Sequence, residues 1–481
     1  MKRLIFVLLL LIGARAFSNN LQIQNLQITG QNTTEHYTMI QFDISWDNSW
    51  RISTGPSNWD AAWVFVKYRI KNQSMWHHAT LHYVDGTGTG DGHTVPANAQ
   101  ISSSDDNGSG GAYGVFIYRD SDMLQSSVSY AGVQLRWDYS VDGLTDKDSV
   151  DLCVFGIEMV YVPQGSFYVG SGSNDYAVLH TYPNISDAYQ ITSENAINVG
   201  STTGYLYYGS CGDRGGPIPA SYPKGYNAFY CMKYEITQEQ YVEFLNKLTS
   251  AQANSRYPNS NGYFRHAITG SWENYSTTLP YVACNFLNWV DLAAYLDWAA
   301  LRPMTELEYE KVARGTVANY PNEFAWGNTS IDYADGILNS GAANETSLNS
   351  SDNCVTNDAG TNGPLRVGCL GQGVNTRTGV GAGYYGAFDL SGNLEERVVN
   401  IGTPEGRSFD GQHGDGVLSI YGDANVTNWP GSSVTGIGFR GGNWKKDYLR
   451  CRVSDRFYDN ETDEASFGLA LMGGRGVRTA P

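Results

Sequence analysis

The sequence predicts an α+β protein in which an N-terminal antiparallel β-sandwich precedes a larger segment with few helices. Three observations support this prediction. From Leu21 to about residue 155, apolar and polar residues alternate with period two. Capping-box patterns, which mark helix starts, are found at Thr237 with Gln240 and at Thr305 with Glu308. The composition has Gly 55, Tyr 33 and Trp 12 beside 16% charged residues, which favours irregular structure packed around aromatic side chains.

The first residues are typical of a secretory signal peptide. Its positive region, apolar run and cleavage-site residues are Lys2-Arg3, 4–12 and Ala14-Arg15-Ala16. We expect residues 1–16 to be removed, so that the mature chain begins at Phe17. It would then act outside the cytoplasm, as a secreted, extracellular, cell-surface or periplasmic protein. Since no later apolar run is long enough to span a bilayer, no transmembrane segment is expected after cleavage.

The net charge and the cysteines restrict the possible partners and cross-links. Lys+Arg 31 against Asp+Glu 48 gives −17, which argues against a nucleic-acid partner or an anionic membrane surface. Seven cysteines fit an oxidising compartment, and the odd count leaves at least one without a disulfide partner. Cys354 and Cys369 flank one Gly/Asn-rich loop, and we predict a disulfide between them.

The N-terminal segment, residues 17–156, contains seven strand-like runs separated by Gly, Asp and Asn turns. These runs are 21–30, 40–46, 61–70, 77–84, 114–119, 133–139 and 150–160. Seven short strands in a segment of this size predict an immunoglobulin-like sandwich. No catalytic constellation stands out in it.

Two features of this segment resemble metal sites but are better explained otherwise. His77, His78, His82 and His93 are close in sequence, yet His78 and His82 on one strand would lie about 13 Å apart. We therefore interpret them as ordinary strand histidines. The loop 85–93 has the Asp/Gly texture of a calcium loop but lacks the closing glutamate of an EF-hand, so a turn-rich hairpin is the better interpretation.

Three short helices are predicted in the second part of the chain, each from a cap and an apolar face. The cap pairs are Thr237 with Gln240, Asn288 with Asp291, and Thr305 with Glu308. A helix as short as the one after Thr305 is only marginally stable alone, so it must pack against the rest of the domain.

The helix after Thr305 also carries a family resemblance. Residues 302–315, RPMTELEYEKVARG, resemble the signature R-L-P-T-E-A-E-W-E-x-A-A-R-G of the sulfatase-modifying-factor family, whose founding activity is formylglycine generation. Here the leucine is displaced to Leu301 and the tryptophan is Tyr309. One family landmark precedes this stretch at 158–171. Others follow it in the family's order, at 383–398, 438–444, 449–456 and 473–478. The resemblance covers about residues 156–481 and implies a C-type-lectin-related domain at 157–481, with little regular secondary structure.

The resemblance also implies a structural calcium ion. Carried over residue by residue, the ligands are Asp389, the carbonyls of Gly392 and Leu394, and Glu396. Such a set of hard oxygen donors suits Ca²⁺. The alternative is a tight Ser-Gly-Asn turn with two exposed acids. The family's tryptophan and its aromatic successor are here Glu395 and Arg397, so the local packing must differ.

The catalytic machinery of the family is incomplete. Active formylglycine-generating enzymes bind copper(I) through two cysteines five residues apart, because this soft ion needs a thiolate pair. Counting from Gly441-Gly442, the first cysteine position is Lys446 and the second is Cys451. Alternatively Cys451 matches a structural residue and both catalytic positions are empty. Copper binding is not expected in either case, and the histidine triad of the related iron enzymes is missing as well.

Two functional hypotheses follow. The first is a non-catalytic binding or structural protein that uses the family scaffold and binds glycan, a surface protein or further copies of itself. Its candidate binding residues are Lys446, Tyr448, Arg450, Arg452 and Asp455. Leu449, Cys451 and Val453 would point inward on a strand. The alternative is a divergent formylglycine-generating oxidase that acts on an exported substrate through Cys451.

Overall fold

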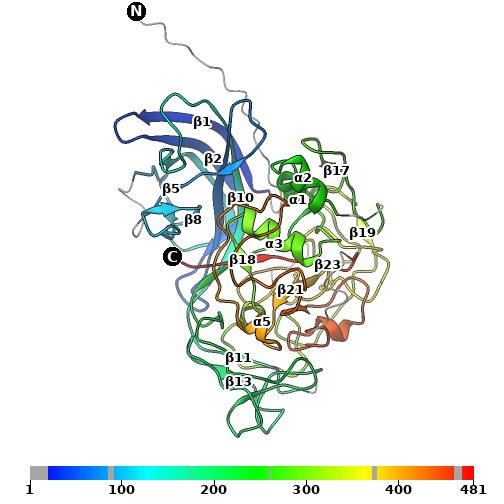
Figure 1. Cartoon of the computed structure of the whole chain (residues 1–481). Helices are drawn as coiled ribbons and strands as arrows, with labels where there is room; N and C mark the ends of the chain where they lie inside the picture. The colour runs from blue at the N-terminus through cyan, green and yellow to red at the C-terminus, as the bar shows by residue number, and fades with distance from the viewer. Residues whose placement is uncertain are drawn as a thin grey trace, which may run out of the picture. The chain divides into compact units, whose positions relative to one another are not determined.

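The computed structural model describes residues 20–84, 92–173, 175–258, 260, 262–370, 376–459 and 469–481 (Figure 1). The predicted signal peptide and most of the loop 85–93 lie outside the described residues. The chain forms two compact units, with the main division between Ile157 and Glu158. Residues 51–61, although early in the chain, belong to the second unit. No helix within the described ranges is both long and apolar enough to cross a membrane.

The first unit consists of strands. They are β1 (Gln22–Asn32), β2 (Tyr37–Arg51), β3 (Asp60–Ile70), β4 (His77–His78), β5 (Leu81–His82), β6 (Ala99–Ser102), β7 (Gly111–Ala112), β8 (Val115–Arg119), β9 (Met123–Trp137) and β10 (Val150–Val162). One sheet has the order β1-β2-β9-β5-β7, and a second set runs β10-β3-β8-β6, with β4 paired to β3. The pairs β1-β2, β5-β9 and β6-β8 are antiparallel.

Strand β2 shows the alternating burial that the sequence pattern predicts. In β2 the residues Ile40, Phe42, Ile44 and Trp46 are buried, and they join apolar residues of β3, β8, β9 and β10 in one core cluster. All seven predicted runs coincide with strands, whereas β6 and β7 were not predicted. These two are short, so their sequences carry too few alternations to be recognised.

The second unit contains short strands and short helices. Its strands are β11 (Phe167–Val169), β12 (His180–Thr181), β13 (Tyr189–Ile191), β14 (Leu206–Tyr207), β15 (Phe229–Met232), β16 (Ile268–Thr269), β17 (Ser276–Thr277), β18 (Arg302–Pro303), β19 (Ile337–Leu338), β20 (Thr346–Ser347), β21 (Glu395–Val399), β22 (Ile437–Arg440), β23 (Met472–Gly473) and β24 (Gly476–Thr479). Its α-helices are α1 (Gln238–Leu245), α2 (Ser250–Arg256), α3 (Trp289–Trp298), α4 (Glu306–Arg314) and α5 (Pro404–Arg407).

Strand pairing in this unit builds one central sheet and several small ones. The central order is β18-β24-β15-β10, to which β10 contributes its last residues. A three-stranded sheet has the order β22-β21-β23, in which β21 is antiparallel to β22 and parallel to β23. In the ribbon, β11 and β13 form a separate hairpin-like pair (Figure 1).

The three predicted helices are confirmed, including their capping boxes. Thr237, Asn288 and Thr305 each accept the N3 amide, and the N3 side chain bonds back to the cap amide. Helix α2, capped by Thr249, was not predicted. Helices α1 and α3 pack through aromatic rings, with Phe244 and Trp298 in an edge contact at 5.4 Å. This packing stabilises helices that are too short to be stable alone.

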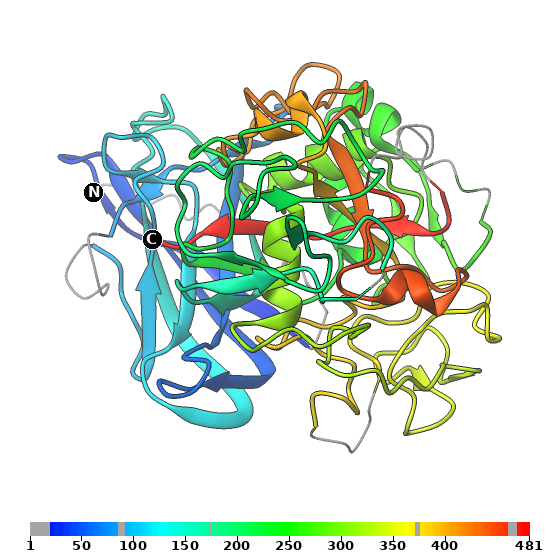
Figure 2. The ribbon, with the colours of Figure 1, turned by 90° about the horizontal axis from the view of Figure 1, so that it is seen from below.

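Between α4 and β21 the described residues run mainly as loops, and the regular elements among them are β19 and β20 (Figure 2). The predicted irregular stretch is therefore found where it was expected. It is held in place by side-chain hydrogen bonds and ion pairs rather than by the backbone hydrogen bonds of a β-sheet. The carboxylate of Glu345, for example, accepts hydrogen bonds from the side chain of Arg265 and the amide of Arg366.

Candidate functional site

The acidic residues of α4 form a buried ion network. Glu306 pairs with Arg456 at 2.7 Å and with Arg440 at 3.0 Å. Glu310 pairs with Arg314 at 2.8 Å and shares Arg440 at 3.0 Å. All five side chains are fully buried. These ion pairs connect the signature helix to the landmarks 438–444 and 449–456. Arg440 is the last residue of β22, and Arg456 is the last residue of the second landmark.

This network gives the signature a structural role. Glu308 caps the helix and also pairs with Arg302 at 2.6 Å, so it serves two contacts at once. Buried charges need such partners, because an isolated ion in the interior costs several kcal/mol. The sequence motif is therefore explained by charge pairing in the core. The partners Arg440 and Arg456 could not be assigned from the sequence, since they lie more than one hundred residues beyond α4.

The predicted calcium ligands lie in the buried turn before β21 and, for Glu396, on β21 itself. Asp389 and Glu396 are both buried, so the alternative of two exposed acids is wrong. Asp389 accepts a hydrogen bond from the amide of Gly368 at 2.7 Å, and Glu396 pairs with Arg475 at 2.6 Å. The second carboxylate oxygen of Glu396, Oε2, has no hydrogen-bond partner among the described residues.

A third carboxylate belongs to the same region. Glu235 accepts hydrogen bonds from the Asn393 side chain and, at 2.9 Å, from the Leu394 amide. Burial, with the nearby carboxylates of Asp389 and Glu396, raises the pKa of Glu235 well above its ordinary value. The sequence analysis missed Glu235, because it lies more than 150 residues before the turn and belongs to no metal motif.

These donors fit a hard cation in their chemistry. Burial is also the main cause that raises the pKa of Asp389 and of Glu396, and Arg475 opposes it in both. A bound Ca²⁺ would neutralise this excess negative charge and give Glu396 Oε2 a partner. Within the described residues, no three acidic, histidine or cysteine side chains are grouped to hold a metal by themselves. A calcium ion would therefore depend on the predicted backbone carbonyls as well, and Arg475 would compete with it.

The predicted disulfide is not formed. All seven cysteines are free and buried. Cys369 packs in an apolar cluster with Val355 and Leu365, whereas Cys354 belongs to another cluster with Phe324 and Trp326. Nearness to the same loop therefore did not bring the two thiols together.

Cys354 instead lies beside Cys451. The two thiols share one cluster, and both side chains are fully buried. Burial, followed by the contact with Cys451, raises the pKa of the Cys354 thiol well above its ordinary value. The two cysteines are far apart in sequence, so spacing rules for thiol pairs could not reveal them.

The predicted binding segment forms a 3₁₀ turn, η1 (Tyr448–Cys451), and no strand. The interpretation as a strand with alternating faces is therefore wrong, because Asp447 caps the turn by accepting the Leu449 amide. Cys451 and Val453 are nevertheless buried, as expected, while Leu449 is half-buried.

The five candidate binding residues do not share one exposed face. Asp455 is buried and pairs with Arg450 at 2.9 Å, so its predicted exposure is wrong. Arg452 pairs with Asp175 at 2.9 Å. Tyr448 packs in part against the cluster of Cys354 and Cys451, and Lys446 is half-buried.

An aromatic and cationic surface nevertheless forms at this segment, and we call it the Phe457 patch. It consists of Tyr176, Lys446, Arg450, Phe457 and Tyr458. The Arg450 guanidinium lies 3.8 Å from the centre of the Phe457 ring, and Lys446 Nζ lies 5.2 Å from that of Tyr458. The rings of Phe457 and Tyr176 are 4.8 Å apart, and each residue is 41% exposed. Tyr176 is nearly three hundred residues away in sequence, so only the fold adds it.

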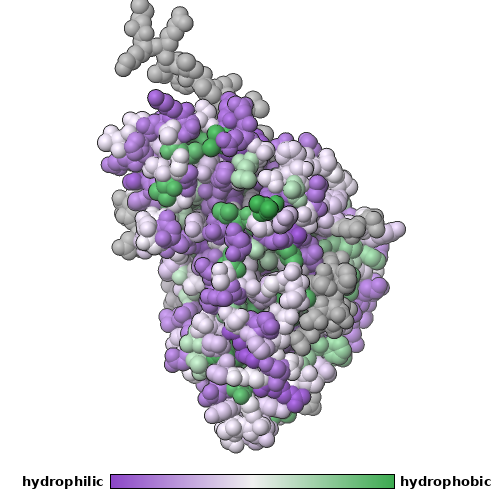
Figure 3. Space-filling model, in the orientation of Figure 1, coloured by the Kyte–Doolittle hydropathy of each residue, from purple (hydrophilic) through white to green (hydrophobic). Residues whose placement is uncertain are grey.

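Exposed hydrophobic residues elsewhere are mostly isolated. The face drawn in Figure 3 is mainly hydrophilic, with hydrophobic residues in small separate spots. Single exposed apolar residues are normal on a protein surface and indicate no site by themselves.

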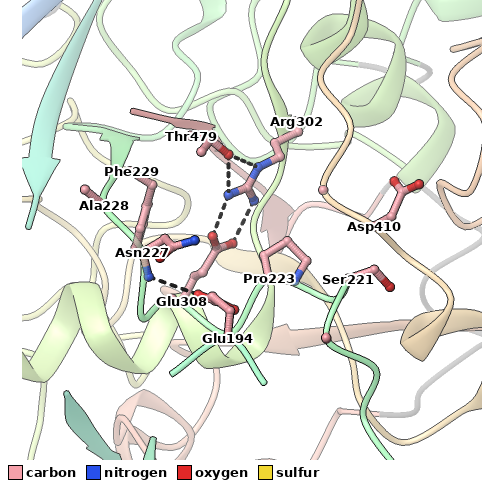
Figure 4. A pocket seen from close by; sticks show the side chains of 13 residues that line it. Glu194, Ser221, Pro223, Asn227, Ala228, Phe229, Arg302, Glu308, Asp410 and Thr479 are labelled. Atoms are coloured by element: carbon pink, nitrogen blue, oxygen red, sulfur yellow. Dashed lines mark hydrogen bonds and ion pairs between the residues drawn. The ribbon is translucent and has the colours of Figure 1, made fainter. Parts of the chain in front are cut away.

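A polar pocket of about 180 Å³ lies beside α4 (Figure 4). Arg302 and Glu308 meet in its wall, and Thr479 accepts hydrogen bonds from Arg302. Glu194 accepts the amides of Lys224 and Asn227. Because these charged groups are already hydrogen-bonded to one another or to the backbone, we assign the pocket no ligand.

The histidines of the first unit have hydrogen-bond partners within the fold. His78 bonds to the carbonyl of Tyr113, His82 pairs with Asp138 at 2.7 Å, and His93 bonds to the carbonyl of His82 at 3.0 Å.

A family model for the sulfatase-modifying factor enzyme 1-like domain matches residues 154–479. The chain belongs to this family, and the predicted resemblance is confirmed. A search of curated proteins found no match.

Proposed function

We propose that this protein is a non-catalytic binding or structural protein, secreted or held at the cell surface, which uses the family scaffold to bind a glycan, a surface protein or further copies of itself. The observation that carries this proposal is the Phe457 patch. Aromatic rings and arginine dominate recognition surfaces because they bury a large area and keep a polar handle.

Several parts of the proposal rest on the sequence. The first unit would serve as an immunoglobulin-like carrier, and the second would have a C-type-lectin-related fold. The signal-like residues 1–16 favour export. A structural calcium ion at Asp389 and Glu396 would hold the turn before β21 in place, without a role in chemistry.

Removing the aromatic rings of the Phe457 patch should weaken binding. In the variant Tyr176→Ala with Phe457→Ala, we expect affinity to fall by about 10- to 30-fold, the loss typical of hot-spot residues. The measurement is a glycan array together with sedimentation velocity on the full chain. Tyr421→Ala is the matched control, since Tyr421 is also an exposed tyrosine but lies outside the patch.

Two outcomes decide this test. Binding or self-association that is lost in the double variant and kept in Tyr421→Ala supports the proposal. A chain that stays monomeric and binds no arrayed glycan, or binds equally well without the two rings, contradicts it. Circular dichroism must show that both variants remain folded.

A second candidate function is a divergent formylglycine-generating oxidase. One observation favours it, namely the second thiol that Cys354 places beside Cys451. Against it stands the complete burial of both side chains, because a catalytic thiol must reach its substrate.

The enzymatic alternative predicts a product, formylglycine, that mass spectrometry can detect. When the protein is incubated with a Cys-x-Pro-x-Arg peptide, copper and oxygen, we expect the peptide cysteine to remain unchanged in mass spectra. Conversion of that cysteine to formylglycine, lost in Cys451→Ser and in Cys354→Ser, would replace our proposal with the oxidase.

A further inference from the structure

The thiols of Cys354 and Cys451 form an isolated pair in the core of the second unit. Both are fully buried in the cluster that contains Phe324 and Trp326. Other buried thiols in the described part of the chain bond elsewhere. Cys211, Cys231 and Cys284 donate to backbone carbonyls.

Hydrogen bonds hold the two cysteine segments side by side. Ser391 contacts both, since its carbonyl accepts the Cys354 thiol at 3.3 Å and its hydroxyl donates to the Cys451 carbonyl at 2.7 Å. The Cys451 thiol bonds to the hydroxyl of Thr356 at 3.2 Å. The amide of Asn357 donates to the carbonyl of Lys446, which fixes the two segments once more. The thiols are therefore aligned by the backbone on both sides.

Two glycines leave room for the sulfur atoms. A Cβ atom at Gly392 would lie 2.9 Å from Cys354 Sγ, and one at Gly442 would lie 2.8 Å from Cys451 Sγ. Both glycines have a positive φ angle, 94° at Gly392 and 66° at Gly442, which residues with a side chain rarely adopt. The landmark glycines thus form the walls of a small compartment that contains the thiol pair.

We propose that Cys354 and Cys451 form a disulfide when the protein meets a thiol–disulfide oxidant. Each S–H bond is broken and one S–S bond forms, while two electrons and two protons reduce oxidised glutathione to two glutathione thiols. Oxidation removes the hydrogen bonds that the two thiols donate to Ser391 and Thr356. The bonds from the Ser391 hydroxyl to the Cys451 carbonyl and from the Thr356 hydroxyl to the Lys446 carbonyl, at 2.9 Å, do not involve the thiol protons and keep the segments in place.

The cross-link would close a loop of about 100 residues, a length at which a disulfide strongly restricts the unfolded chain. It would also fix the last residue of η1, the turn that carries Arg450 of the Phe457 patch. The bond therefore stabilises the second unit whether or not the patch binds a partner.

The test uses the full chain, purified under reducing conditions. It is incubated with oxidised and reduced glutathione a few degrees below its unfolding transition, so that local opening admits the reagent. After alkylation without reduction, peptide mapping should show two of the seven cysteines protected, in one linked peptide pair that contains Cys354 and Cys451. The unfolding temperature should rise by about 4 °C or more.

Variants separate this bond from other oxidation. Cys354→Ala and Cys451→Ala should each lose both the linked peptides and the gain in unfolding temperature, whereas Cys369→Ala should keep them. Seven alkylated cysteines in the oxidised wild-type chain, or a linked pair that contains a different cysteine, would overturn the proposal. The mapping of the wild-type chain decides the question even if a variant does not fold.

Discussion

Replacing Glu306 by alanine should destabilise the second unit by about 3–5 kcal/mol, the usual cost of breaking a buried ion pair. Glu306 accepts hydrogen bonds from Arg456 and Arg440 and, at 2.8 Å, from the amide of Ile401. Without the carboxylate, both guanidinium groups keep their charge, because an arginine does not deprotonate in a protein. The variant therefore leaves each buried guanidinium with only one of its two carboxylate partners, Glu310 for Arg440 and Asp459 for Arg456.

Denaturant unfolding of the full chain measures this effect, with a fluorescence or circular-dichroism transition assigned to the second unit. The matched control is Glu405→Ala, since Glu405 is an exposed glutamate of α5, and its loss should change stability by less than about 0.5 kcal/mol. An equally small change for Glu306→Ala would contradict the role given to the network.

The same residue gives a pH dependence with a defined sign. Burial alone would raise the pKa of Glu306, but Arg456 and Arg440 outweigh it and hold the pKa at about 2. An unfolded glutamate has a pKa of about 4.3. Because the folded pKa is lowered, the stabilisation is complete above the unfolded value and is lost as pH falls from about 5 to about 2. The stability difference between wild type and Glu306→Ala should therefore shrink over this range.

Calcium should stabilise the second unit through Asp389 and Glu396. At free calcium about a hundredfold above Kd, binding to the folded state alone adds about 2.7 kcal/mol. Thermal unfolding with calcium and with chelator measures the difference, and Glu396→Gln should abolish it. Asp358→Asn is the control, since Asp358 is exposed and asparagine tolerates its positive φ of 50°.

Proton release provides an independent readout of the calcium site. The pKa values of Asp389, Glu396 and Glu235 are raised by burial, so each carboxyl gives stability below its unfolded pKa that is lost as pH rises through its folded pKa. A cation favours the ionised forms, and calcium affinity should therefore increase with pH. Calorimetry in buffers of different ionisation enthalpy detects the released protons. An unfolding transition that chelator leaves unmoved would mean that Arg475 alone balances these charges.

The sequence by itself determined the local structure and the family. Thr237, Asn288 and Thr305 set their helix starts through residues three positions away, and alternation in Ile40 to Trp46 set a strand. Such patterns depend on near neighbours, so they can be read without the fold. Residues 302–315 indicated the family for the same reason, since the whole signature lies in one short run.

Only the tertiary structure decided which distant groups meet. It placed Cys451 beside Cys354, brought Arg440 and Arg456 to Glu306, and added Tyr176 to the Phe457 patch. These contacts join segments from different parts of the chain, and their geometry comes from the packing of irregular loops around buried charges. The periodicity of the sequence does not predict which arginine pairs with Glu306. Buried ion pairs depend on which charged groups lie close together in the folded protein, and not on their spacing in the sequence.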